Sequence, residues 1–263
     1  MLVTRSGAGR PLLLVHGLGS TSRVWTPVLA ALAAKRDVWA LDLPGHGGAL
    51  AEGDSDNFAG LARSLEAYLD REGLGGIDMV GSSLGGQLVL EMARRGKAGA
   101  TVALDPGGFW IGWERAAIKA SLTASLFTVR GIKPALPMLA GSAVSRTLML
   151  GLLSARPWSL DGELVASELE AFADASTLDA LINDVAFGQS QLGPASQASG
   201  PVTLGWGRHD KLCNPAQAAR AVTAFPDARL HWFEKSGHFP MWDEPVEAAA
   251  MILRATEETA VRR

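Results

Sequence analysis

The sequence predicts an α/β fold in which helices flank an open, mostly parallel β-sheet. Short apolar runs of strand length alternate with helical patterns over residues 1–108 and again over residues 200–263, which is typical of parallel strands joined by covering helices. Residues 109–199 lack this alternation and have a mostly helical pattern. With 263 residues, 48% of them hydrophobic, the chain suits one large domain. We therefore expect a core formed by residues 1–108 and 200–263, with residues 109–199 inserted as a helical cap.

Six strands and three helices of the core can be predicted individually. Strands are expected in six apolar runs that end in glycine or polar loops: residues 11–17, 37–47, 77–81, 100–108, 201–210 and 229–238. The helix over 58–73 has Leu61, Leu65 and Leu69 at helical spacing and ends at Gly73. A helix over 84–96 must begin almost directly after the strand 77–81. The last helix, 244–258, has proline near its first turn.

The predicted cap is rich in aromatic side chains, and three prolines divide it. The prolines at 134, 137 and 157 predict several short helices, because proline interrupts the helical hydrogen-bond ladder. The aromatic residues are Trp110, Trp113, Phe127, Trp158, Phe172 and Phe187. Aromatic side chains at helical spacing usually fill a core. Each of these residues is therefore expected either to pack in the core of the cap or to contact the substrate.

Composition and charge argue against several classes of function. The net charge is −3 and the pI is about 6.0, which favours neither nucleic acid nor an anionic membrane as partner. No apolar run reaches the length of a membrane span, and the N-terminal residues lack the pattern of a signal peptide. The single cysteine, Cys213, allows no internal disulfide. We expect a cytoplasmic protein with a small-molecule substrate, and the sequence does not set its oligomeric state.

The stretch "GSSLGG" (81–86) predicts a nucleophilic serine on a sharp turn between a strand and a helix. Such a turn crowds the positions two before and two after the nucleophile, so both must be glycine. Ser83 has Gly81 and Gly85 at these positions, whereas Ser82 has Val80 and Leu84. Ser83 is therefore the candidate nucleophile, and Ser82 is a small neighbour.

A serine nucleophile needs a base, and the base needs an orienting acid. His238 lies in a loop after the last strand, where a parallel sheet builds its site. Asp210 follows the preceding strand and comes between Ser83 and His238, in the chain order that this architecture requires. Asp105 also ends a strand and remains the alternative acid; otherwise it caps backbone groups before Pro106.

Two backbone N–H groups are expected to stabilise a tetrahedral oxyanion. Leu84 follows the nucleophile at the start of a helix, and Leu18 lies in the glycine loop "HGLGS" (16–20). His16 is expected to brace this loop without a chemical role, and Cys213 to serve in packing. The substrate pocket is expected to include Gly17, Gly19, Phe109, Trp110, Trp158 and Phe239.

Together, "HGLGS", "DLPGHG", "GSSLGG", "GRHD" and "SGHFPMWDEP" resemble the α/β-hydrolase superfamily, and in particular its small, cap-bearing serine hydrolases. The resemblance covers nearly the whole chain and implies a Ser83–His238–Asp210 triad, oxyanion donors at Leu18 and Leu84, and a reaction without metal or cofactor. Only ten residues precede Pro11, whereas the family usually has two strands there. We therefore expect the family's first strand to be missing, which leaves about seven.

These residues predict a serine hydrolase that cleaves a carboxylic ester or thioester with an apolar acyl part. Hydrolysis of a carbon–carbon bond in a vinylogous diketone acid could use the same triad, with Arg130, Arg146 or Arg156 binding the acid. A receptor that keeps an intact triad and senses a small molecule is the alternative from another class. The cap sequence matches no subfamily motif, so the substrate itself stays open.

Overall fold

The computed structural model describes residues 1–188 and 190–257 and has one seven-stranded sheet. The spatial order is β1-β3-β2-β4-β5-β6-β7. β1 runs antiparallel to β3, and every other neighbouring pair is parallel. The strands are β1 Leu2–Gly7, β2 Pro11–Val15, β3 Asp37–Asp42, β4 Ile77–Ser82, β5 Ala98–Leu104, β6 Val202–Gly207 and β7 Arg229–Phe233. The predicted fold class, including the number of strands, is confirmed.

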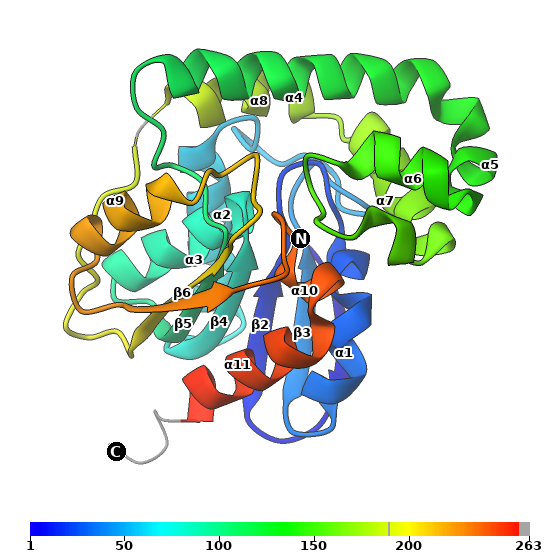
Figure 1. Cartoon of the computed structure of the whole chain (residues 1–263). Helices are drawn as coiled ribbons and strands as arrows, with labels where there is room; N and C mark the ends of the chain where they lie inside the picture. The colour runs from blue at the N-terminus through cyan, green and yellow to red at the C-terminus, as the bar shows by residue number, and fades with distance from the viewer. Residues whose placement is uncertain (189, 258–263) are drawn as a thin grey trace.

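Helices cover both faces of the sheet (Figure 1). The core helices are α1 Thr26–Ala33, α2 Phe58–Arg71, α3 Leu84–Arg94, α9 Ala216–Ala224, α10 Pro240–Asp243 and α11 Pro245–Glu257, with the 3-10 turn η1 Ser22–Trp25. The predicted helices 58–73, 84–96 and 244–258 correspond to α2, α3 and α11; residue 258 lies outside the described residues.

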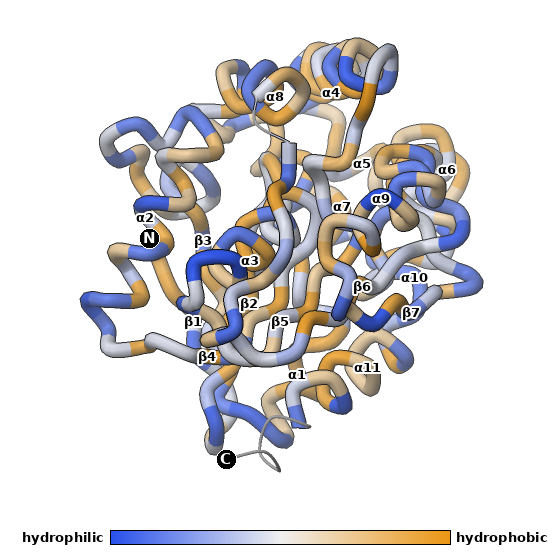
Figure 2. The backbone as a smooth tube through the Cα atoms, turned by 90° about the vertical axis from the view of Figure 1, so that its left-hand side faces the viewer, coloured by the Kyte–Doolittle hydropathy of each residue, from blue (hydrophilic) through white to orange (hydrophobic). Residues whose placement is uncertain are grey.

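Alternating side chains of the strands pack into two hydrophobic cores, one on each face of the sheet. Leu13 and Val15 of β2 belong to the core under α2 and α3, whereas Leu12 and Leu14 belong to the core under α1 and α11. This alternation follows from the two-residue period of a strand. In Figure 2 blue, hydrophilic backbone gathers in the peripheral turns, and the central strands are mainly white to orange.

Between β5 and β6 the chain forms a layer of helices, and Figure 1 shows its longest helix, α4, across the top of the molecule. These elements are α4 Trp113–Ile132, η2 Lys133–Ala135, α5 Leu136–Gly141, α6 Ala143–Leu150, η3 Pro157–Ser159, α7 Gly162–Asp174 and α8 Leu178–Phe187. Each of the three prolines lies in the first turn of a short element, η2, α5 or η3. α4 precedes them and therefore runs uninterrupted over 20 residues.

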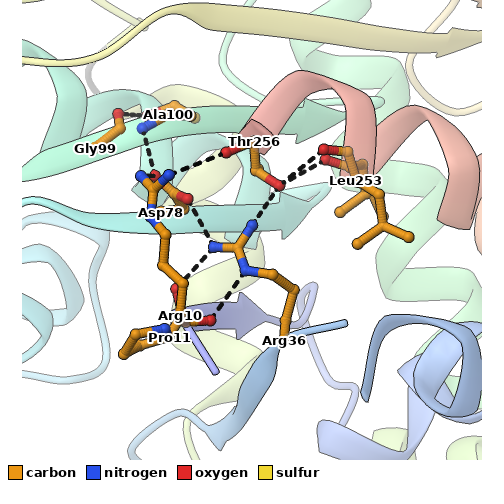
Figure 3. Close-up of polar contacts among 10 residues, drawn as sticks. Arg10, Pro11, Arg36, Asp78, Gly99, Ala100, Leu253 and Thr256 are labelled. Atoms are coloured by element: carbon orange, nitrogen blue, oxygen red, sulfur yellow. Dashed lines mark hydrogen bonds and ion pairs between the residues drawn. The ribbon is translucent and has the colours of Figure 1, made fainter. Parts of the chain in front are cut away.

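A buried ion-pair network closes the end of the sheet where the parallel strands begin (Figure 3). One Asp78 carboxylate oxygen accepts hydrogen bonds from Arg10 Nη2 at 2.7 Å and from the Ala100 N–H at 2.9 Å; the other accepts from Arg36 Nη2 at 2.6 Å. Arg36 also donates to Thr256 of α11 at 2.6 Å. The network therefore joins β2, β3, β4 and β5 to the last helix. In the described part of the chain, no helix is long and apolar enough to cross a membrane.

Candidate active site

Ser83 lies on a strained turn between β4 and α3. Its backbone has φ 55° and ψ −116°, in a region that residues other than glycine rarely adopt. A Cβ atom at Gly81 would lie 2.0 Å from the Gly85 carbonyl oxygen, and one at Gly85 would lie 2.1 Å from the Val15 carbonyl oxygen. A side chain at either position would therefore clash with a backbone oxygen, which explains why both residues are glycine. Ser82 is the last residue of β4 and is fully buried.

His238 and Asp210 form a buried hydrogen-bonded pair. His238 Nδ1 lies 2.8 Å from Asp210 Oδ2, and Asp210 Oδ1 accepts the N–H groups of Leu212 at 2.7 Å and Cys213 at 2.9 Å. An ionised carboxylate only accepts, so His238 carries a hydrogen on Nδ1 and, when neutral, a lone pair on Nε2. Nε2 has no hydrogen-bond partner among the described residues. His238 and Ser83 line the same cavity.

Asp105, the alternative acid, has a different environment. Its Oδ1 accepts the Gly207 N–H at 2.8 Å, and its backbone has φ 44°. Complete burial, followed by the nearby charge of Asp210, raises the pKa of the Asp105 carboxyl well above its ordinary value. The hydrogen bond that His238 donates from Nδ1 is accepted by Asp210 and not by Asp105.

The glycine loop after β2 lies against Ser83. A Cβ atom at Gly17 would lie 3.2 Å from Ser83 Cβ, so the loop that carries Leu18 packs on the turn. His16 Nε2 accepts the Leu43 N–H at 3.0 Å, so its Nδ1–H donates to the Gly17 carbonyl oxygen at 2.7 Å. Burial and the neighbouring His46 lower the pKa of His16 to about 3, and this histidine is a neutral brace. Leu84 is the first residue of α3, where N–H groups lack helical partners.

Glu168 of α7 ties the helical layer to the same loop. Its carboxylate accepts hydrogen bonds from Ser20 Oγ at 2.5 Å, Thr21 Oγ1 at 2.5 Å and the Thr21 N–H at 3.1 Å. Burial raises the pKa of Glu168, and these hydrogen bonds oppose the rise. Sequence reasoning missed this residue. The available signal was an acid on the apolar face of a helix, between Val165 and Phe172.

A largely apolar cavity of about 130 Å³ opens at Ser83 and His238. Its walls come from both the core and the helical layer, and the latter contributes Ile118, Leu122, Val129, Leu153, Leu169 and Phe172. None of the described lining residues is Lys or Arg, and Glu168 contributes a carboxylate. The cavity suits an uncharged, apolar group.

Four of the six predicted pocket residues, Gly17, Gly19, Trp110 and Phe239, line this cavity. Phe109 is wrong: its ring packs on Trp206, with the ring centroids 6.4 Å apart, in the core under α3 and α9. Trp158 does not line this cavity either, because η3 presents its side chain, 53% exposed, to a different hollow.

Asp210, Cys213 and His238 offer three possible metal-ligand atoms within 4.8 Å of one another. Burial raises the pKa of the Cys213 thiol well above its ordinary value, and the thiolate is the form that binds metals. A cation there would also displace the hydrogen bond between Asp210 and His238. The hydrogen-bonding pattern therefore fits an acid–base pair better than a metal site.

The profile of the alpha/beta hydrolase family matches residues 12–251. The chain belongs to this family. Among curated proteins, a pimeloyl-[acyl-carrier protein] methyl ester esterase of Aromatoleum aromaticum is 29% identical over 92% of this chain and 96% of its own. An esterase from Thermogutta terrifontis has a similar structure, with a TM-score of 0.75, 19% identity, and coverage of 98% of this chain and 93% of that one. A meta-cleavage product hydrolase from Pseudomonas fluorescens follows at TM-score 0.73, with 18% identity and coverage of 97% and 93%. At these identities the two structures establish the fold alone.

Proposed function

We propose that this hydrolase cleaves a carboxylic ester or thioester with an apolar acyl part through an acyl-enzyme. Ser83 Oγ attacks the carbonyl carbon while His238 Nε2 takes its proton and then gives it to the leaving group. Asp210 holds the imidazole tautomer and stabilises the imidazolium. The N–H groups of Leu18 and Leu84 donate to the oxyanion. Water, activated by the same histidine, releases the acid.

The observation that carries the proposal is the shared cavity of Ser83 and His238, with the unpartnered His238 Nε2 beside it. In the proposed role of cap, the helices α4–α7 supply apolar walls that exclude water from the acyl group. The curated esterase relative supports ester chemistry, since that protein's name describes a methyl ester esterase.

The charge of the cavity disfavours hydrolysis of a vinylogous diketone acid. Such a substrate carries a carboxylate, and burial of an unpaired carboxylate is costly. Arg130 is bound to Asp179 at 2.9 Å, and Arg146 donates to the backbone carbonyls of Ala140 and Trp158. Neither arginine lines the cavity, whereas the Glu168 carboxylate does. The substrate that fits is uncharged at its acyl end.

Hydrolysis of p-nitrophenyl esters of increasing acyl length tests the proposal. The Ser83→Ala variant should lose activity by roughly 10⁶-fold, as expected when the nucleophile of a triad is removed. Ser82→Ala is the matched control and should retain activity, because Ser82 lies outside the cavity. Turnover by Ser83→Ala near the wild-type rate would refute the assignment, and slow single turnover by the wild type would favour the receptor alternative.

A further inference from the structure

A second hollow lies next to the site, and it contains the tryptophan that the sequence placed in the substrate pocket. This groove has a volume of about 470 Å³ and is lined by side chains from the α6–η3 region and from the loops after β6 and β7. Its polar and aromatic members are Thr147, Ser154, Arg156, Trp158, His209, Lys211 and Lys235. We call it the Trp158 groove.

The Trp158 groove is cationic although the whole chain has a net charge of −3. Arg156, Lys211 and Lys235 line it, and no lining residue among those described is acidic. Two acids contact residues of the groove without lining it: Asp243 of α10 accepts the Ala155 N–H at 2.8 Å, and Glu244 accepts the Lys235 N–H at 2.8 Å. Asp243 accepts hydrogen bonds from Ser154 Oγ at 2.5 Å and the Gly237 N–H at 2.7 Å. Glu244 accepts from Ser236 Oγ at 2.7 Å. Three cationic side chains among the lining residues favour a ligand with several negative charges.

Trp158 adds a flat apolar surface beside these cations. Its backbone is held, because its carbonyl oxygen accepts a hydrogen bond from Arg146 Nη2 at 2.9 Å. Its side chain nevertheless remains 53% exposed. An exposed indole stacks on the π-face of a base, while Arg and Lys bind phosphate oxygens. A groove with both features suits a phosphorylated nucleotide better than inorganic phosphate.

A thin segment of chain separates the Trp158 groove from the active-site cavity. Leu152 and Leu153 line the cavity, whereas Gly151, Ser154 and Ala155 line the groove. The Leu153 carbonyl oxygen accepts the His238 N–H at 2.8 Å, so this segment lies directly on the loop of the proposed base. The groove and the cavity therefore lie on the two sides of residues 151–155.

We propose that the Trp158 groove binds the phosphorylated nucleotide of a thioester leaving group, the chemistry of coenzyme A, while the apolar acyl part occupies the cavity. This inference rests on the proposed function for the reaction, but the groove itself can be tested without turnover. Of the two substrate classes in the proposed function, ester and thioester, the groove favours the thioester.

Calorimetric titration of the full-length Ser83→Ala protein tests binding without hydrolysis. The probes are free coenzyme A, adenosine 3′,5′-bisphosphate and inorganic phosphate. Both nucleotides should bind, phosphate should bind at least tenfold more weakly, and high salt should weaken all three because it screens exposed charges. Adding Arg156→Gln and Lys235→Gln should weaken nucleotide binding at least tenfold. Adding Lys35→Gln, at an exposed lysine after α1, should change nothing.

Steady-state kinetics then connect the groove to the reaction. In the otherwise wild-type chain, Arg156→Gln/Lys235→Gln should raise KM at least tenfold for an acyl-coenzyme A and leave KM unchanged for the p-nitrophenyl ester of the same acid. Trp158→Ala should raise KM for the thioester alone. Absence of nucleotide binding at millimolar concentration, or equal binding by the groove variants, overturns the inference even if Ser83 is essential. Nucleotide binding together with an active Ser83→Ala variant would leave the groove intact and refute the proposed function instead.

Discussion

Asp105 and Asp210 follow neighbouring strands, yet the two carboxyls have different hydrogen-bond partners. Asp210 accepts from His238, whereas Asp105 accepts the Gly207 N–H, and burial raises the pKa of the Asp105 carboxyl well above its ordinary value. Replacing Asp210 with Asn should lower kcat by roughly 10⁴-fold, because an amide favours the wrong histidine tautomer. Replacing Asp105 with Asn keeps an acceptor oxygen for the Gly207 N–H and leaves the bond between His238 and Asp210 in place, so kcat should fall far less, by about tenfold or less on the same scale. Ester hydrolysis at pH 7 measures both, and equal losses would contradict the assignment.

Glu168 is expected to act on the reaction through the loop it holds. Its carboxylate fixes Ser20 and Thr21, which follow the proposed oxyanion donor Leu18. Glutamine supplies only one acceptor oxygen, so Glu168→Gln should lower kcat about tenfold, equivalent to about 1.4 kcal/mol of transition-state stabilisation. KM should change little, because the cavity walls remain. Glu170→Gln in the same helix is the control. An increase in KM with kcat unchanged would instead indicate a role in substrate binding.

At the scale of elements, the close contact between the start of α3 and β2 places the nucleophile. A Cβ atom at Gly85 would meet the backbone oxygen of Val15 at 2.1 Å, and a backbone atom cannot rotate away. Gly85→Ala should therefore push α3 off the sheet, lower the unfolding free energy by about 1–3 kcal/mol, and reduce ester hydrolysis. Gly75→Ala is the control, since a Cβ atom there would meet nothing within 4 Å. Urea denaturation and kcat measure the two effects, and a wild-type result for Gly85→Ala would contradict this account.

The elements that the sequence predicts best are those whose side-chain pattern follows directly from burial. Strands β2 to β7 overlap the six predicted runs, although β4 ends one residue after its run and β5 begins two residues before its run. The central strands among them are apolar on both faces, which makes their runs easy to recognise. α1 and α9 were not assigned: their apolar residues are mostly alanine and valine, which give a weak periodic signal. The sequence does not show that Phe109 and Trp158 lie outside the cavity at Ser83, because the direction of a side chain after a turn depends on tertiary packing. The role of Glu168 could not be predicted from the sequence, because its hydrogen-bond partner Thr21 lies 147 positions away in the chain.

At the scale of the whole molecule, one end of the sheet carries the candidate site and the other end carries a stabilising ion-pair network. The candidate site occupies the end where the parallel strands finish, and the Asp78 network ties together the end where they begin (Figure 3). Because the site and the Asp78 network lie at opposite ends, the network can stabilise the fold while Ser83 keeps its strained backbone with positive φ. Changes at the Asp78 end should therefore alter stability without altering the reaction of the folded enzyme.

Asp78→Asn tests this separation. The Asp78 carboxylate is fully buried, and Arg36 beside it is nearly so, so removal of the negative charge leaves a buried cation unpaired. We expect the unfolding free energy to fall by about 3–5 kcal/mol. Asp37→Asn is the matched control at the same end of the sheet. Its partner Arg5 has a side chain 57% exposed, so the loss should be about 1 kcal/mol or less.

Urea denaturation gives the two free energies, and kcat for p-nitrophenyl ester hydrolysis at low temperature reports on the folded fraction. The Asp78→Asn protein that remains folded should turn over at the wild-type rate. Equal destabilisation by both variants would show that burial of the Asp78 network adds nothing to its strength. A fall in kcat at full folding would show that the two ends of the sheet are coupled, because distortion at Asp78 would then reach Ser83 along β4, which contains Asp78 and ends directly before Ser83.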